Sequence, residues 1–208
     1  MNKSGSLLFL SLLIFAFGCA QSKQERERLV GGNCEDCALM FAGMPSTLSW
    51  KTKLAPDDEP GEPLLISGTI YKRDGKTPAR DVILYVYQTD SKGLYSPGLQ
   101  QTQAKRHGHL RGWVKTDAQG RYEFRTVRPA SYPNSQNPQH IHAIVKETGL
   151  SFYWIDDFVF DDDPLLTASV RSRQTKRSDS GIITLSKNQE NVWIGSRDII
   201  LGLNIPNY

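Results

Sequence analysis

Short runs of alternating apolar and polar residues recur along most of the chain, with the two-residue period that is typical of β-strands. The runs are rich in β-branched and aromatic residues, and turn-forming residues separate them, as at Asp74-Gly75 and Gln119-Gly120. Strands are predicted over residues 64–71, 82–89, 112–116, 121–127, 140–145, 152–160, 181–186 and 197–203. Beside them the pattern predicts only one short helix, around residues 37–41.

The strand predicted over residues 82–89 is apolar on both faces, because apolar side chains fill odd and even positions alike. A strand of this kind lies between two packed layers. Hairpin follows hairpin, and 208 residues suit one domain with one sizeable core, so the sequence predicts an all-β fold, an antiparallel β-sandwich. Four tyrosines in strand bodies are assigned to packing alone: Tyr85, Tyr87, Tyr122 and Tyr153.

The N-terminus has the pattern of an export signal, because Lys3 precedes an apolar run over residues 7–17 and Gly18 stands directly before Cys19. The run is short for a membrane-spanning helix. A small residue before a cysteine resembles a bacterial lipoprotein processing site. This predicts that residues 1–18 are removed and that a lipid on Cys19 anchors the protein to a membrane of the bacterial cell envelope. An ordinary secretory signal, cleaved nearby, is the alternative.

Composition shifts then divide the rest of the chain into three parts. Residues 19–28 are polar and read as a tether, and residues 29–63 form an N-terminal arm that ends in an exposed, proline-bearing stretch after Trp50. The predicted sandwich occupies residues 64–208. Lys and Arg number 25 against 22 Asp and Glu, and the only basic block, residues 171–177, is expected to be a solvated loop. This balance argues against nucleic acid as a partner.

The arm carries Cys34 and Cys37 in a C-x-x-C pair. In an oxidising, exported setting the first interpretation is a local disulfide that staples the arm, because no second pair or histidine set completes a zinc site. A redox-active thiol of the thioredoxin type is the alternative. The flanking residues lack the strand-then-helix pattern that activates such a thiol, so the structural interpretation is favoured.

Four residues that can bind a metal stand where predicted strands begin or end. Tyr95 follows strand 82–89, Tyr132 follows strand 121–127, and His140 and His142 alternate on the next strand, so that both imidazoles project on one face. Phenolate oxygens favour ferric iron over zinc, ferrous iron or magnesium. Two tyrosinates and one hydroxide would also neutralise a 3+ ion in a partly buried site. The four residues therefore predict one Fe(III) per chain.

Several sequence blocks between residues 64 and 164, in this order, resemble the intradiol ring-cleavage dioxygenases: GTIYKRDGKTPARDVILYVYQTD, GLYSPG, LRGWVKTDAQGRYEFRTVRPASYP, PQHIHAIV and FVFDDDP. The resemblance implies that Tyr95, Tyr132, His140 and His142 hold the iron and that Tyr132 is the axial ligand, which leaves when substrate arrives. It also implies a small aromatic diol of the catechol type and O2 as partners, with ring cleavage to a muconate-type diacid. A homodimer stays open.

Two positions depart from the pattern that the resemblance implies. Asn137 stands three residues before the first histidine, where the family usually has arginine, and an approximate alignment places Asp157 where the family tends to have glutamine. Both replaced groups stabilise negative charge on the substrate in those enzymes. Asn137 and Asp157 therefore join Tyr132 as candidate catalytic positions. A catalytically inactive, exported β-sandwich binding module on the same scaffold is the alternative function.

A second H-x-H motif, His107 and His109, is flanked by Lys105, Arg106 and Arg111. These cations would repel a metal ion. The segment is therefore expected to be a surface loop or a substrate-entry loop.

Overall fold

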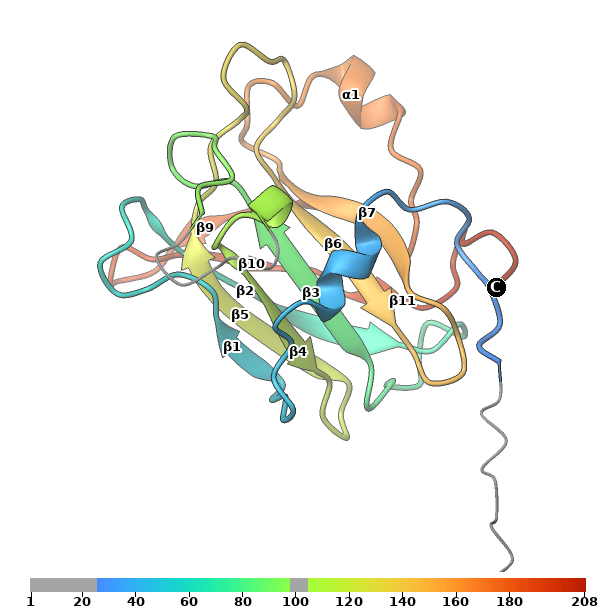
Figure 1. Cartoon of the computed structure of the whole chain (residues 1–208). Helices are drawn as coiled ribbons and strands as arrows, with labels where there is room; N and C mark the ends of the chain where they lie inside the picture. The colour runs from blue at the N-terminus through green and yellow to red at the C-terminus, as the bar shows by residue number, and fades with distance from the viewer. Residues whose placement is uncertain (1–25, 98–104) are drawn as a thin grey trace, which may run out of the picture.

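Two β-sheets packed against each other make up most of the structure, a computed structural model that describes residues 26–97 and 105–208 (Figure 1). The first sheet has the order β1 (Lys51–Lys53), β5 (Arg121–Val127), β2 (Pro63–Tyr71), β10 (Trp193–Ser196) and β9 (Ser186–Lys187), with β11 (Ile199–Ile200) also paired to β2. The second has the order β4 (Arg111–Lys115), β3 (Ile83–Gln88), β6 (His140–Lys146), β7 (Tyr153–Phe160) and β8 (Ile182–Ile183). The predicted all-β sandwich is confirmed.

The long central pairs are antiparallel, whereas the short strands β1, β8, β10 and β11 pair in parallel with their longer neighbours. Three short helical turns complete the described structure: η1 (Cys37–Phe41), η2 (Lys105–His107) and α1 (Ala168–Ser172). The turn predicted around residues 37–41 is present, while α1 was not predicted. Among the described residues, no helix is both long and apolar enough to cross a membrane.

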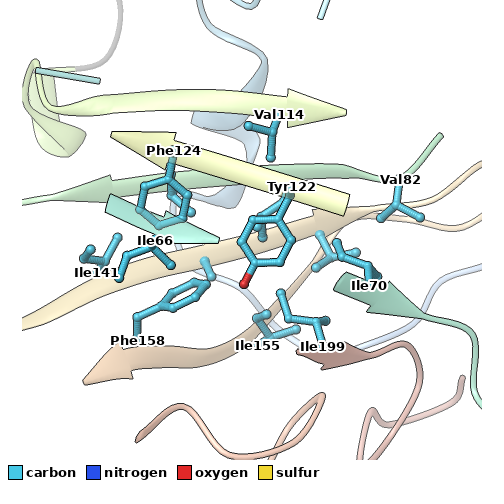
Figure 2. Packing of buried hydrophobic residues seen from close by; sticks show 14 of the residues in the cluster. Ile66, Ile70, Val82, Val114, Tyr122, Phe124, Ile141, Ile155, Phe158 and Ile199 are labelled. Atoms are coloured by element: carbon cyan, nitrogen blue, oxygen red, sulfur yellow. The ribbon is translucent and has the colours of Figure 1, made fainter. Parts of the chain in front are cut away.

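The core lies between the inner faces of the two sheets (Figure 2). Ile66 of β2 and Phe124 of β5 face Phe158 of β7, and the rings of Phe124 and Phe158 meet edge to face with centroids 5.7 Å apart. All three side chains are fully buried. Burial of each stabilises the fold by about 1.5–3 kcal/mol relative to exposure, so these contacts hold the two sheets together.

The alternation of buried and outward-facing side chains along β6 decides on which face of the sheet its two histidines lie. Ile141, Ala143 and Val145 are buried in the core between the sheets. Successive side chains of a strand lie on opposite faces, so His140 and His142 lie on the outer face of the second sheet. The fold thus places the H-I-H motif of His140 and His142 away from the core.

The N-terminal arm covers part of this outer face. Cys34 and Cys37 form a disulfide with Cα atoms 5.5 Å apart, and Met40 of η1 packs with Tyr85 and Ile144 of the sheet. In Figure 1 this segment, in blue, runs in front of β3 and β6. The arm is therefore part of the folded unit.

Parts of the predicted secondary structure are wrong. The stretch after Trp50 begins with a strand, β1, that pairs with β5, and it continues with the buried residues Leu54 and Ala55, so it is not wholly an exposed arm. A three-residue strand that begins and ends with lysine has too little alternation to be recognised. The strands predicted over 181–186 and 197–203 are only short pieces, β8, β9 and β11, and β10 was missed.

The basic segment 171–177 also differs from its prediction as a solvated loop. Arg177 is buried, with its guanidinium 3.5 Å from the Trp154 ring centre, and it donates a hydrogen bond to the Gly31 carbonyl oxygen (2.9 Å). An arginine can be buried when aromatic rings and carbonyl oxygens replace water. Arg177 is therefore packed against the second sheet, whereas Arg173 and Lys176 are exposed, as the sequence predicts. The predicted signal, residues 1–18, and Cys19 lie outside the described residues.

Candidate metal centre

The polar atoms of four side chains converge at one point on the second sheet. Tyr95 Oη lies 2.7 Å from Tyr132 Oη and 2.9 Å from His142 Nε2. Tyr132 Oη in turn lies 2.9 Å from His140 Nε2 and 3.2 Å from His142 Nε2. The structure thus brings together all four residues that the sequence predicts as metal ligands.

Two loops carry the tyrosines to the end of β6 where His140 begins the strand. The loop after β3 holds Tyr95 and the loop after β5 holds Tyr132, and both stand at the upper end of the molecule in Figure 1, as does α1. The loops are tied together, because Thr89 Oγ1 donates to the Ala130 carbonyl oxygen (2.7 Å) and Ala130 N donates to the Asp90 carbonyl oxygen (3.1 Å). The two tyrosines are therefore held as a pair.

Gly93 allows the close approach of these loops. Its φ of +79° is favoured only by glycine, and a Cβ atom there would lie 2.1 Å from the Ser131 carbonyl oxygen. The Asp90 carboxylate shapes the same turn by accepting hydrogen bonds from the backbone of Lys92 and Leu94 and from Ser96 Oγ. Aspartate commonly accepts backbone hydrogen bonds in tight turns, and these bonds hold the G-L-Y-S segment, which carries Tyr95, close to Asp90.

The partners of Nδ1 decide which nitrogen of each histidine can bind a metal. His140 Nδ1 donates to the Pro138 carbonyl oxygen (2.7 Å), and His142 Nδ1 donates to Asp157 Oδ1 (3.0 Å). Carbonyl and carboxylate oxygens only accept hydrogen bonds, so the neutral imidazoles carry their protons on Nδ1. Both Nε2 lone pairs therefore point toward the tyrosine hydroxyls.

Burial sets the protonation of the site. It raises the pKa of Tyr95, which the hydrogen bond with Tyr132 raises further, and it raises the pKa of Tyr132. Burial also lowers the pKa of His140. The tyrosines are then phenols and His140 is neutral at physiological pH. A cation that binds the two oxygens has to displace two protons, so its affinity increases with pH.

A β-bulge places Asp157 beside His142. Ile141 pairs with Phe158 and Ala143 pairs with Ile155, so β7 has two residues, Asp156 and Asp157, opposite the single His142. A bulge of this kind redirects a side chain without ending the pairing. Asp157 was a candidate catalytic position on the sequence; the structure shows that it contacts a histidine of the centre.

The donor atoms fit a metal ion. Ligands about 2 Å from one ion, at angles near 90°, lie about 3 Å apart. The four contacts span 2.7–3.2 Å, and two phenol oxygens with two imidazole nitrogens suit ferric iron. His140, His142 and Asp157 also offer ligand atoms within 4.8 Å of one another. Asp157, however, binds the Nδ1 side of His142, away from the converging donors.

A cleft of about 420 Å³ opens on the centre. Tyr132, His140, His142 and Asp157 lie on its wall, and the exposed Asn137 stands at the same cleft. The segment that follows α1 also lines the cleft, with Arg173, Gln174 and Thr175. Tyr95 borders a second hollow, beside Tyr87 and His107. A small molecule that enters the first cleft therefore meets Tyr132.

The second H-x-H motif departs from the predicted surface loop at His107, whereas the alternative, a substrate-entry loop, stays a prediction. The His107 side chain is buried, Nδ1 lies 2.9 Å from Tyr85 Oη, and its ring stacks on Tyr87 at 3.7 Å. Tyr87 stacks in turn on His142 at 4.5 Å, so it supports the centre and does more than fill the core. Stacking between residues far apart in sequence leaves no local signal.

His109 connects the loop that carries Tyr95 to the N-terminal arm. Its Nδ1 lies 2.8 Å from the Ser96 carbonyl oxygen, next to Tyr95, and its Nε2 lies 2.7 Å from Glu59 Oε2. Glu59 lies in the stretch that the sequence assigned to an exposed arm. The arm thus reaches the loop that carries Tyr95.

Comparison with known proteins agrees with the fold and the centre. A sequence model of a dioxygenase family, described as Dioxygenase, matches residues 42–194. This match covers well over half of the chain and includes all four converging residues. The chain belongs to the intradiol ring-cleavage dioxygenase family.

Its relatives include enzymes that act on different aromatic diols. Catechol 1,2-dioxygenase 1 of Acinetobacter lwoffii is 33% identical over 132 residues, which cover 56% of this chain and 41% of the relative. The protocatechuate 3,4-dioxygenase beta chain of Burkholderia cepacia is 31% identical over 113 residues, which cover 51% of this chain and 48% of the relative. The chain thus matches less than half of the length of these relatives.

A solved structure shows the same fold at low sequence identity. The dioxygenase domain of a dioxygenase and carbohydrate-binding protein fusion from Streptomyces sp. SirexAA-E superposes with a TM-score of 0.57. The superposition covers 76% of this chain and 91% of that chain, with 22% identity.

Proposed function

We propose that this protein is an Fe(III)-dependent intradiol dioxygenase that cleaves the ring of a catechol-type diol with O2 to a muconate-type diacid. The observation that carries the proposal is the convergence of Tyr95, Tyr132, His140 and His142 through their Oη and Nε2 atoms. The family membership of the chain supports it. One ferric ion per chain is proposed.

The four residues would divide the work between holding iron and moving protons. Bound Fe(III) would supply a Lewis acid that polarises the oxygens of the diol. Tyr132 faces the cleft and lies on a loop, whereas the histidines lie on a strand. Tyr132 is therefore the group that would move aside for the diol and accept one of its protons on Oη. Tyr95 and the histidines keep their positions.

The charges of side chains near the cleft affect how a negatively charged diol can bind there. Asn137 brings no charge to the position where the family usually has arginine, and Asp157 adds a negative one. Arg173, which lines the cleft, is an exposed cation whose Nη1 donates to Ser169 Oγ (2.9 Å). We propose that Arg173 stabilises negative charge on the bound diol.

The first test is the iron content and the visible spectrum of the purified protein, before and after addition of catechol. Two phenolates on iron should give a red-brown protein whose absorption band shifts when catechol binds, followed by loss of catechol and formation of a diacid. Tyr132→Phe should weaken the band, and Tyr71→Phe, a tyrosine of β2 outside the centre, should leave it unchanged. A colourless protein that stays free of iron after loading would refute the proposal.

The alternative is an exported binding module on the same scaffold, which the replacements at Asn137 and Asp157 favour. Such a module would bind little iron tightly, or would bind iron without turnover of catechol. The spectrum and the product assay separate these outcomes.

We further propose that the mature protein is lipid-anchored through Cys19 after removal of residues 1–18. The charge and apolar pattern of the N-terminus supports this proposal. Expression of the full chain should place it in the membrane fraction, and Cys19→Ser should release it. Retention of the variant in the membrane would contradict the anchor. Dimerisation stays a prediction for solution measurements of mass.

A further inference from the structure

Asp157 contacts the centre through a histidine and not through the converging donor atoms. Its Oδ1 accepts from His142 Nδ1 at 3.0 Å, and the two side chains are 36% and 26% exposed. An aspartate ordinarily loses its proton well below pH 7, so the group beside His142 is a carboxylate at neutral pH.

The position of Asp157 is fixed by its surroundings. The bulge sets it opposite His142, and Gly181 packs so closely that a Cβ atom there would lie 2.0 Å from the Asp157 carbonyl oxygen. Its neighbour Asp156 accepts hydrogen bonds from the backbone of Lys176 and Arg177 and from Thr175 Oγ1. The two aspartates of the bulge thus have different roles. Asp156 fixes the segment that lines the cleft, and Asp157 binds His142.

A carboxylate and an amide differ at this position in charge and not in shape. Both can accept the Nδ1 proton of an imidazole. Only the carboxylate draws that proton toward itself strongly, which increases the electron density on Nε2 and makes the ring a better metal ligand. The Pro138 carbonyl oxygen, the partner of His140, has no such charge. The two histidines are therefore unequal donors.

We propose that Asp157 is a positioning residue that fixes the Nδ1–H tautomer of His142 and strengthens the donation of its Nε2 to the metal. The inference rests on the proposed function, since it concerns the ferric ion of that centre. A stronger imidazole donor makes bound Fe(III) less electron-poor and harder to lose. Phenolate-to-iron charge transfer then needs more energy than it would beside an uncharged amide.

The test compares three variants of the iron-loaded protein. Asp157→Asn keeps an acceptor and removes the charge, and its absorption band should move to longer wavelength than in the wild type. Asp157→Ala removes acceptor and charge, and should bind iron about 10–100-fold more weakly. Asp58→Asn, an exposed carboxylate in the arm, controls for the loss of one negative charge and should match the wild type in both measurements.

A readout on the metal-free wild type covers the case in which the variants fold poorly. Nitrogen-15 NMR should show His142 as the Nδ1–H tautomer alone. A mixture of tautomers would overturn the proposal, and so would an Asp157→Asn protein whose band and iron affinity equal those of Asp58→Asn. Both results can occur in a protein that binds iron and cleaves catechol, so they are distinct from failure of the proposed function, which a wild type without iron would show.

Discussion

His107 shows how burial sets the charge of one side chain beside the centre. It lies between the Tyr87 ring and the Tyr85 hydroxyl, and burial lowers its pKa to about 4. The sequence suggested a surface or substrate-entry loop, because the basic neighbours of His107 in the chain would repel a metal ion. The tertiary structure instead gives a neutral imidazole that supports the ring stacked on His142.

The depressed pKa of His107 predicts an acid-sensitive fold. In the unfolded chain this histidine takes up a proton near pH 6.5, and in the folded protein only near pH 4, so its stabilising contribution is lost as the pH falls between these values. The slope from this one residue is at most about 1.4 kcal/mol per pH unit. In His107→Asn, whose amide oxygen can still accept from Tyr85, urea unfolding at pH 7, 6 and 5 should show a shallower dependence on pH.

His109 provides the opposite case for that experiment. Burial would lower its pKa, but the hydrogen bond with Glu59 raises it, so its contribution is present at low pH and is lost as the pH rises. His109→Asn should therefore steepen the loss of stability on acidification. Equal slopes in the wild type and His107→Asn would contradict the assignment to His107.

At the scale of elements, the centre depends on one strand and two loops that meet its first residues. The strand could be predicted from the sequence, because Ile141, Ala143 and Val145 alternate with the histidines. The contact between the loops could not, since it joins Gly93 to Ser131 across the end of the sheet. Likewise nothing local marks the bulge that sets Asp157 beside His142.

Gly93→Ala should separate the two tyrosines. A Cβ atom would meet the Ser131 carbonyl oxygen, and the positive φ adds backbone strain, so the free energy of unfolding should fall by more than about 1 kcal/mol. Iron affinity should fall as well, because Tyr95 and Tyr132 move apart. Chemical unfolding and iron titration measure the two effects.

Gly149→Ala is the matched control for that variant. Gly149 has a φ of +78°, nearly that of Gly93, but nothing lies within 4 Å of its Cβ position. Gly149→Ala should therefore lower the free energy of unfolding through backbone strain but leave the iron affinity unchanged. Loss of iron in both variants, or in neither, would contradict a role for the contact between the loops.

At the scale of the whole molecule, the two sheets hold the centre in place from the opposite side of β6. Phe124 comes from the first sheet and packs on Phe158, the next residue after Asp157 in the second. The cleft is completed by the segment after α1, while the arm packs on the outer face of the same sheet. Segments that lie far apart in the chain therefore meet around the centre.

Phe124→Ala should remove a large share of the stability. Truncation of a fully buried phenylalanine costs about 3–5 kcal/mol, against about 5–15 kcal/mol for a whole domain. Phe41→Ala, at a ring that is 42% exposed and meets Phe152 edge to face, should cost about 1 kcal/mol. Thermal and urea unfolding compare them. Similar losses in the two variants would show that the inter-sheet core is not the main source of stability.

By itself, the sequence determined the long strands of the sandwich, the face of β6 that carries His140 and His142, and the set of four converging residues, because side-chain alternation and residue chemistry are local properties. The tertiary structure decided what each donor touches. It buried His107 and Arg177. It also connected the arm to the loop that carries Tyr95 through Glu59 and His109, and it brought Asp157 within hydrogen-bond distance of His142. The two contacts of His109 join residues that are 13 and 50 positions apart in the chain. The contact between Asp157 and His142 depends on a bulge in β7. The free energy that selects such contacts comes from packing of the whole chain and is therefore not visible in a local stretch of sequence.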